Sequence, residues 1–425
     1  MIPALQHLCL NIRIFKRHLF NALTLLAFLP LTYVGPEKAI GLQTDRSPSE
    51  KAIAESTQFL ISQQANDGAW HSEHYGSMKQ GAANTALVLY ALSHLRPEQL
   101  RAHAASIDKA REFLVQGIEK KGCLANPEGS LDYPVYGTAL ILSAHQRIDL
   151  KLTSKQIQAM VQYLVDCQCM QPRGFDAQNP NHGGWDILGT GPTQGKTSGA
   201  NISVTFYVAQ ALSPYRPDKT TKEEPTKEEP SLNRKRGIEL PDDLKRKVET
   251  ALVAAEKWCN RIADSSNDGG FYFTSKRKSM LNKAGWQDEQ MKLPSAYGSA
   301  TCDGLSLLMQ VSGGQTDKRT KAAVGWLANH PGVETVPGFG EEVDSIGWPS
   351  SLRFYYAAAL SRSLGLFEKD QAAEIKNAIV KQLTQNQLES GAWQNESSAM
   401  RENDELIATP FGLIALLNCV STEKK

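Results

Sequence analysis

The sequence predicts an all-α protein built from about six repeated pairs of helices. A pattern of glutamine, glycine and tryptophan occurs twice, as QQANDGAW (Gln63–Trp70) and as QNQLESGAW (Gln385–Trp393). Each copy follows a run with helical periodicity and precedes a second, more apolar run. Similar pairs of runs recur at intervals of roughly 40 to 65 residues, and units of this kind bury their apolar faces only by stacking on neighbours.

Each predicted unit has an outer and an inner part. The units span residues 52–95, 109–148, 156–215, 248–313, 319–366 and 374–420. The first run of each unit keeps charged residues, such as Lys51 and Glu55 or Lys376 and Lys381, which suit an exposed face. The second run is apolar on nearly every side, so we expect it to lie inside.

The repeated pattern itself is interpreted as a clasp between neighbouring units. Gln63 and Gln64 end the first helix, and residues 66–68 (Asn-Asp-Gly) supply a tight turn. Trp70 can then fold back on the helix end while a glutamine amide caps its free backbone groups. The pattern degrades to NDGGFYF (267–273) in the fourth unit and to PGFG (337–340) in the fifth. A purely local helix stop is the alternative interpretation.

The N-terminal residues 1–41 are predicted to be a signal peptide or membrane anchor. Arg13, Lys16 and Arg17 precede the uncharged run Leu19–Val34, which is shorter than the ~20 residues of a spanning helix. We therefore expect export, as a periplasmic, secreted or membrane-anchored protein. Membrane contact is expected only through this segment, and residues 42–420 form the repeats.

Charge gives little indication of a partner. The chain has 46 Lys and Arg against 45 Asp and Glu, so no global field favours nucleic acid, and we expect no nucleic-acid partner. Residues 216–241 contain TKEEPTKEEP, which has no apolar side chain to bury. This stretch is predicted to be a disordered charged insertion.

The cysteines do not indicate a disulfide scaffold. Of the seven, Cys9 would leave with the signal peptide. Cys259, Cys302 and Cys419 lie inside apolar helical patterns, where buried thiols are expected.

Four segments together resemble the terpenoid cyclase and protein prenyltransferase superfamily. They are QQANDGAW, QLESGAW, GGWDILGTG and ANISVTFYVAQAL, and the resemblance covers residues 52–420. The chain is similar to squalene cyclase-like proteins, that is, to prenyltransferase and squalene oxidase repeat proteins. The resemblance implies an α/α toroid (α6/α6 barrel) whose inner helices enclose a cavity, which that superfamily uses for isoprenoid chains.

The motifs that carry the superfamily's chemistry are missing. Squalene cyclases protonate their substrate with an Asp-x-Asp-Asp run, which is absent here. The nearest acids are Asp303 and the pair Asp404 and Glu405, which could equally complement a helix dipole.

A zinc site is not predicted either. Prenyltransferases bind zinc with Asp-x-Cys and a later histidine, but Ala300 stands two positions before Cys302. His71, His74 and His182 could hold a metal only if separate loops converged, and we expect ordinary loop histidines. No cofactor is predicted.

Candidate ligand contacts lie on the inner runs. Asp303 is the candidate acid, and the candidates for the cavity wall are Phe206, Tyr207, Tyr297, Cys302, Phe354, Tyr355 and Phe411. The basic stretch Ser275–Lys283, with Arg353, could hold a diphosphate if it faced the mouth, although a solvated loop is the more ordinary interpretation.

The sequence therefore favours an exported toroid that binds an apolar, isoprenoid-like small molecule or a protein partner without the superfamily's catalytic motifs. Two alternatives stay open. One is a terpenoid cyclase-like enzyme with Asp303 as its acid. The other is a carbohydrate-active α/α toroid, since Asp176 and Asp186 share one long loop.

Overall fold

The chain divides into two units, Met1–Asp45 and Arg46–Lys425, and only the second is described. The computed structural model describes residues 47–75, 78–124, 132–189, 199–217, 239–263, 268–276, 278–288, 290, 293–340 and 347–421. The predicted signal segment (1–41) and TKEEPTKEEP lie outside these ranges. Within them, none of the helices combines the length and apolar character needed to cross a bilayer.

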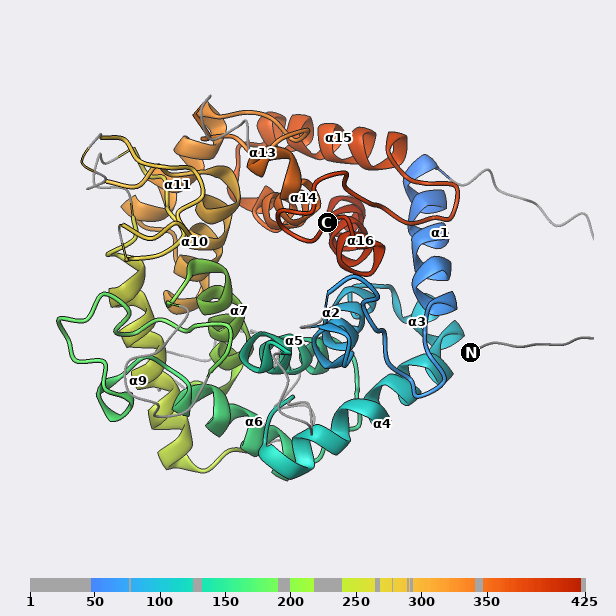
Figure 1. Cartoon of the computed structure of the whole chain (residues 1–425), viewed down its shortest axis with the longest axis horizontal. Helices are drawn as coiled ribbons and strands as arrows, with labels where there is room; N and C mark the ends of the chain where they lie inside the picture. The colour runs from blue at the N-terminus through green and yellow to red at the C-terminus, as the bar shows by residue number, and fades with distance from the viewer. Residues whose placement is uncertain are drawn as a thin grey trace, which may run out of the picture. The chain divides into compact units, whose positions relative to one another are not determined.

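In the second unit the major helices form two concentric rings, as predicted (Figure 1). The outer ring contains α1 (Pro48–Ser62), α4 (Ala104–Lys121), α6 (Ser154–Asp166), α9 (Asp242–Cys259), α11 (Lys318–Asn329) and α15 (Lys369–Gln385). The inner ring contains α2 (Ala82–Leu92), α5 (Pro134–Arg147), α7 (Ile202–Leu212), α10 (Gly298–Val311), α14 (Arg353–Ser361) and α16 (Glu405–Ser421). Each inner helix contacts the next, and α16 contacts α2, so the inner ring is closed. The all-α toroid is therefore confirmed.

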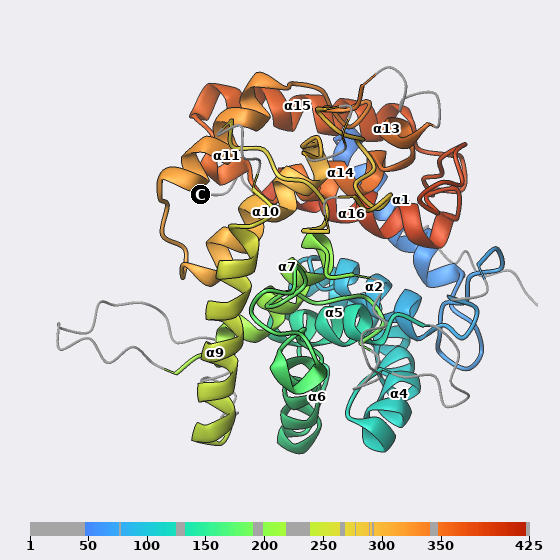
Figure 2. The same cartoon turned by 60° about the vertical axis from the view of Figure 1, so that its left-hand side comes forward.

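Short helices occupy the connections. They are α3 (Pro97–Ala102), α13 (Trp348–Ser351) and the 3-10 turns η2 (Gln171–Arg173), η3 (Ser213–Tyr215) and η4 (Leu364–Leu366). Figure 2 shows the outer helices α4, α6 and α9 side by side, in agreement with their contacts.

Burial separates the two rings as the sequence pattern indicates. Every residue of α2 is buried, whereas α15 buries only Ile379, Gln382 and Leu383. The charged face of α1 is exposed, and there Lys51 Nζ lies 3.7 Å from Glu55 Oε1. The core thus lies between and within the rings.

The repeated glutamine–tryptophan pattern does form a clasp. Gln64 Nε2 donates to the carbonyl of Ser106 (2.8 Å), in the first turn of the next outer helix, α4. Trp70 folds back so that its Nε1 donates to Leu60 O (2.6 Å), and its backbone N–H donates to Thr85 Oγ1 (3.0 Å). One short segment therefore joins an outer helix, its own inner helix and the next unit.

The same clasp occurs at the ring closure and once more in the third unit. Gln387 Nε2 donates to Ala52 O (2.9 Å), which ties the last unit to the first. Gln168 Nε2 donates to Ala251 O of α9 (2.8 Å). This third copy was not recognised in the sequence because Gln168 and Gly183 are 15 residues apart, against four in the other two copies.

The two degraded copies differ from each other. In the fourth unit a carboxylate replaces the amide, since Asp268 Oδ2 accepts from Trp326 Nε1 of α11 (3.1 Å). In the fifth, the carbonyl of Pro337 accepts the N–H of Gly298 (2.9 Å), so PGFG turns back onto the head of α10. PGFG therefore joins its unit to a neighbour, as expected of a degraded clasp, but it reaches back to the fourth unit, whereas the intact copies reach the following one.

Polar caps start some outer helices before the apolar pattern that predicted them. Ser47 and Glu50 form a capping box, so α1 begins at Pro48 rather than near Ala52. Thr153 and Asp317 cap α6 and α11 in the same way. These caps contribute no apolar side chain, which is why periodicity misses them.

The second helix of the fifth unit is split. The continuous run SSLRFYY predicts one helix, but α13 ends at Ser351 and α14 begins at Arg353. Glu402, from the loop before α16, accepts the N–H groups of Phe354 (3.0 Å) and Tyr355 (2.7 Å). A carboxylate from the sixth unit thus fixes a new helix start.

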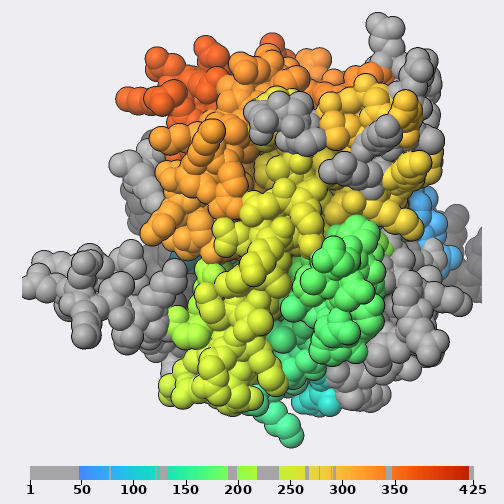
Figure 3. Space-filling view, turned by 90° about the vertical axis from the view of Figure 1, so that its left-hand side faces the viewer, coloured from blue at the N-terminus to red at the C-terminus, as the bar shows by residue number. Residues whose placement is uncertain are grey.

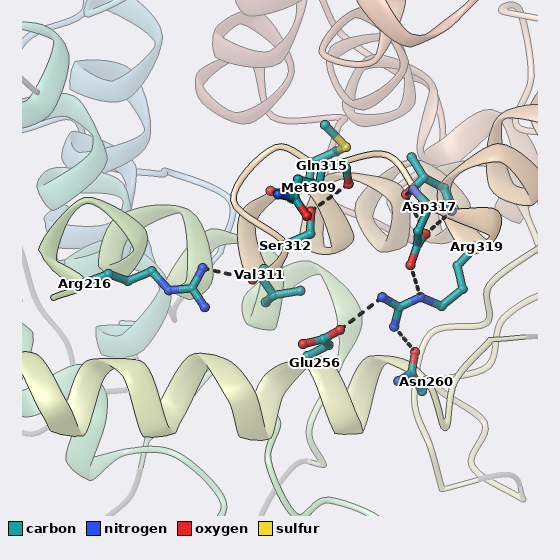
Figure 4. Close-up of polar contacts among 10 residues, drawn as sticks. Arg216, Glu256, Asn260, Met309, Val311, Ser312, Gln315, Asp317 and Arg319 are labelled. Carbon is teal, nitrogen blue, oxygen red and sulfur yellow. Dashed lines mark hydrogen bonds and ion pairs between the residues drawn. The ribbon is translucent and has the colours of Figure 1, made fainter. Parts of the chain in front are cut away.

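Both ends of the predicted insertion 216–241 are folded. Arg216 forms an ion pair with Glu249 (2.7 Å) and donates to the carbonyl of Val311 (2.9 Å; Figure 4). Leu240 is buried. The predicted boundaries are therefore too wide, because the insertion was delimited by composition and these anchoring contacts are long-range.

Helix α9, which follows the insertion, is also held to α11. Arg319 donates to Glu256 Oε1 (3.0 Å), Asn260 Oδ1 (2.6 Å) and Asp317 Oδ2 (2.7 Å; Figure 4). Figure 3 shows α9 crossing this face of the outer ring. The Arg319 contacts therefore fix the position of α9 relative to α11.

A glycine in the clasp permits the close approach of the next helix. Gly391 has φ of +85°, and an added Cβ would lie 2.5 Å from the carbonyl oxygen of Glu55 in α1. We expect Gly391→Ala to lower the free energy of unfolding by about 1–3 kcal/mol, since both the backbone and α1 must shift. Urea unfolding followed by circular dichroism measures this.

Gly325 supplies the matched control for that prediction. It lies in α11 with nothing within 4 Å of an added Cβ, so Gly325→Ala should be neutral or stabilising by up to about 1 kcal/mol. Equal effects of the two substitutions would show that the close approach at Gly391 does not matter.

Candidate functional site

Asp303 lies at the centre of a hydrogen-bonded group on the inner ring. It is fully buried on α10. Its Oδ2 accepts hydrogen bonds from Ser203 Oγ on α7 and from the Tyr355 hydroxyl on α14, both at 2.6 Å. Its Oδ1 accepts from Arg362 Nη2 at 2.8 Å, just after α14. Asp303 is thus shared between the two helices that flank α10.

The electrostatics of this group favour an ion pair. Burial raises the pKa of the Asp303 carboxyl, while Arg362 and the Ser203 and Tyr355 hydroxyls oppose that rise. Burial acts to lower the pKa of Arg362, but Tyr207, Asp303 and Tyr355 raise it more, so it lies above its usual value. The arginine keeps its charge, and Asp303 is its counter-ion.

Aromatic side chains surround the ion pair from several helices. The Arg362 guanidinium lies 4.6 Å above the ring of Phe206 and 5.6 Å above that of Tyr207. The Tyr207 ring meets Tyr136 of α5 edge-on at 5.1 Å and Tyr90 of α2 at 6.0 Å. Because α14, α7 and α2 are not neighbours around the ring, these contacts span its interior.

Part of this group is accessible. Tyr136, Ser203, Gln210, Tyr355 and Arg362 are each partly exposed, although all lie on or beside inner helices. Outer helices cover the back of these helices, and neighbouring inner helices cover their sides. The exposed part of each side chain therefore faces the ring axis or an end of the ring.

The structure brings five of the predicted candidates together. Asp303 and Tyr355 are hydrogen-bonded, Phe206 and Tyr207 lie beneath Arg362, and Phe411 meets Tyr355 edge-on at 5.1 Å. They come from four helices of the inner ring.

The other three candidates are packed elsewhere in the core. Tyr297 is buried against Phe339, with ring centroids 5.1 Å apart. Phe354 and Cys302 are completely buried. Burial, helped by the neighbouring Asp303, raises the pKa of the Cys302 thiol above its usual range, as expected for an unreactive thiol. Their role as ligand contacts stays a prediction.

Sequence reasoning missed Arg362, the partner of Asp303. Arg362 follows Tyr355 by seven residues, which is two helical turns, so both lie on one face. An arginine at the end of an apolar inner run requires a counter-ion once it is buried, and that signal was available. The pairing itself joins residues 59 positions apart and depends on the ring.

The alternative acids, Asp404 and Glu405, belong to a helix start. Asp404 Oδ1 accepts the N–H of Leu406 (2.9 Å), and its Oδ2 accepts from Ser72 Oγ (2.5 Å). Burial and the Asp404 charge raise the pKa of Glu405. Asp404 therefore caps α16 and joins it to the first unit.

The candidate histidines do not converge. His71 lies 2.6 Å from Lys79 O and 3.0 Å from Asp67 Oδ2, while His182 lies 2.9 Å from Phe175 O. Among the residues that the structure describes, no three histidine, cysteine, aspartate or glutamate side chains are placed to hold a metal ion.

Asp176 and Asp186, the candidate carboxylate pair, serve separate turns. Asp176 Oδ1 accepts from the backbone of Gln178 and Asn179 (both 3.0 Å) on the exposed surface. Asp186 is buried, and its Oδ1 accepts from the backbone of Gly189 (2.7 Å). In the described ranges, no contact joins the two carboxylates.

The fold and this inner face define an α/α toroid, and solved structures of that class resemble the chain. A variant of the type II terpene cyclase MstE from Scytonema, in complex with its product merosterolic acid A, matches with a TM-score of 0.53 at 12% identity, over 88% of this chain and 97% of that one. Another variant of the same enzyme, in complex with its substrate geranylgeranyl dihydroxybenzoate, matches with a TM-score of 0.52 at 14% identity, over 88% of this chain and 97% of that one. The GH76A α-1,6-mannanase from Salegentibacter sp. HEL1_6 matches with a TM-score of 0.52 at 12% identity, over 88% of this chain and 99% of that one.

These likenesses establish the fold, because identities this low do not carry an activity. A scan against models of known families finds no match, and a search of curated proteins finds no relative.

Proposed function

We propose that this chain is a toroid that binds an apolar small molecule on the inner face of its ring, without the cyclase reaction. The observation that carries the proposal is the set of partly exposed side chains around the ring axis. Tyr136, Ser203, Gln210, Tyr355 and Arg362 come from three inner helices and the end of one of them. Side chains that serve only as packed core would be fully covered.

The chemistry of this face suits a largely apolar ligand with few polar groups. Two of the five side chains are tyrosines, whose rings offer apolar surface. The hydroxyls, the amide and the Arg362 guanidinium supply a small number of fixed hydrogen-bonding positions. The type II terpene cyclase MstE shares this fold and is solved in complex with its product, merosterolic acid A. That likeness supports an isoprenoid-like ligand as the first class to test.

The contacts of Asp303 are the reason for proposing binding rather than cyclisation. An acid that protonates an alkene must itself be protonated and is usually held by other carboxylates. In the described part of the chain, Asp303 is instead contacted by an arginine and by two hydroxyls that donate to it. Its carboxylate oxygens are occupied by donors, and these donors counteract the rise in its pKa that burial causes.

A panel of isoprenoids, sterols and fatty acids tests the proposal by thermal shift. A ligand at ~100 times its dissociation constant should add about 2.7 kcal/mol to the stability. Tyr136→Trp places more volume on the axis. It should weaken the apparent affinity for the ligand at least tenfold and so reduce the thermal shift. Val253→Trp, on the exposed side of α9, is the matched control and should have no effect.

Product analysis of the same panel separates a binding protein from an enzyme. We expect stabilisation without product. Turnover of squalene or a related polyene that disappears in Asp303→Asn would replace the proposal with an acid-initiated cyclase. Absence of any stabilising ligand would remove the inner face as the functional site.

A further inference from the structure

Lys283 is a buried cation without a counter-ion among the described residues. It lies in the loop between α9 and α10, and only 8% of it is exposed. Its Nζ lies 3.7 Å from the centroid of the Phe273 ring and 6.0 Å from that of Trp348. These aromatic faces are its interactions in the structure, which gives it no ion pair in the described ranges.

Such an arrangement is costly without an anion. Buried ammonium groups are normally paired with a carboxylate or another anion, because desolvation of the charge is not repaid otherwise. Aromatic rings return about 2 kcal/mol or somewhat more in a desolvated site, less than the cost of burying an unpaired ammonium group. Burial accordingly lowers the pKa of Lys283 to about 8. A bound anion would supply what the protein's own side chains do not.

Lys283 also lies at the end of the ring where the inner helices begin. The carbonyl of Phe273 accepts the N–H of Ile202, the first residue of α7 (2.9 Å). Trp348 begins α13, which leads directly into α14. Ser203 and Tyr355, two of the partly exposed axis residues, lie in the first turns of those same two helices.

A second cation is found at this end. Arg353 is the first residue of α14, is partly buried, and has its guanidinium 4.9 Å above the Phe354 ring. Its Nε is buried without a hydrogen-bond partner. Like Lys283, it forms no ion pair with any described residue.

We propose that Lys283 binds an oxyanion, a carboxylate or phosphate group, at the end of the ring where α7 and α14 begin, with Arg353 as a second donor. The anion can be free or can be the polar end of the molecule bound on the ring axis. The second case rests on the proposed function, and the first does not.

Isothermal titration of the full chain with three probes distinguishes these cases. The probes are pyrophosphate, hexadecanoate and hexadecanol, the last two being matched in length and differing in charge. Lys283→Met keeps the length and apolar packing, whereas Lys283→Arg keeps the charge. We expect Lys283→Met to weaken at least one of the two anions tenfold or more and to leave hexadecanol unchanged. Lys283→Arg should retain most of the anion affinity.

Pyrophosphate binding that depends on Lys283 supports a free-anion site, and hexadecanoate binding alone supports the polar end of an axial ligand. Equal anion affinity in wild type and Lys283→Met would overturn the inference, as would an equal loss of hexadecanol. If hexadecanol fails to bind the wild type, the proposed function fails while the pyrophosphate result still decides the anion site.

A measurement on the wild-type chain covers the case in which Lys283→Met does not fold. The Lys283 side-chain ¹³C resonance, assigned with Lys283→Arg, should titrate near pH 8 without anion. A bound anion stabilises the charged form, so the midpoint should move upward when the anion is added. A midpoint that no anion moves would contradict the proposal.

Discussion

A chain that ends at Glu368, before α15, is expected to lose cooperative unfolding altogether. Helix α16 packs against α14, α1 and α2, so its removal uncovers faces on both sides of the gap. Every residue of α2 is buried in the complete ring. Each large apolar side chain exposed costs about 1.5–3 kcal/mol, and several such losses exceed a typical total stability of about 5–15 kcal/mol.

The polar links across the closure disappear in the same truncation. The amide of Gln387 no longer reaches Ala52 O, and Asp404 no longer accepts from Ser72. The carboxylate of Glu402, which fixes the start of α14, is also removed. The damage therefore extends into the fifth unit.

Urea unfolding followed by circular dichroism at 222 nm measures this effect. The control is a chain that ends at Ser421, the last residue of α16, which should unfold as the full chain does. A truncated protein with a single sigmoidal transition would show that the units form an open solenoid whose ends do not depend on each other.

The second large effect is expected at the buried ion pair. Asp303→Leu leaves the Arg362 guanidinium without its counter-ion and should cost about 3–5 kcal/mol in the free energy of unfolding, and Arg362→Met should cost a similar amount. The double variant removes both charges and should be several kcal/mol more stable than the sum of the single effects indicates. The coupling energy from this double-mutant cycle is the quantity of interest.

The exposed pair of Lys51 and Glu55 is the matched control, and its coupling energy should be at most about 1 kcal/mol. A similarly small coupling at Asp303 and Arg362 would mean that water reaches both groups. The proposed ligand-binding face would then be an open, solvated surface.

The fold could be predicted because its signals are local. The clasp around Gln64 and Trp70 and the apolar inner runs each occupy a short stretch of sequence, and repetition makes them visible. The third clasp escaped because a loop separates Gln168 from Gly183. The helix starts were displaced because caps such as Ser47 carry no hydrophobic signal.

The candidate site could be predicted only in part. Asp303 was a candidate as an acid on an inner run, and Tyr355 as an aromatic residue of the cavity wall. The role of Arg362 became clear only from the contacts between α10 and α14. The burial of Lys283 also could not be predicted. The stretch SKRKSMLNK suggests a solvated loop, and only tertiary packing buries its last residue, Lys283. Contacts between residues of different units cannot be predicted from local sequence patterns.

The clasps have a consequence for how freely this chain can vary. Each glutamine amide of the three copies ends on a main-chain carbonyl of the next unit, that of Ser106, Ala251 or Ala52. A joint that recognises only backbone is indifferent to the side chains of the helix it holds. Almost all solvent-exposed residues of the outer helices can therefore be substituted while the order and spacing of the units persist. A ring assembled in this way can keep its fold while the sequence of its surface diverges.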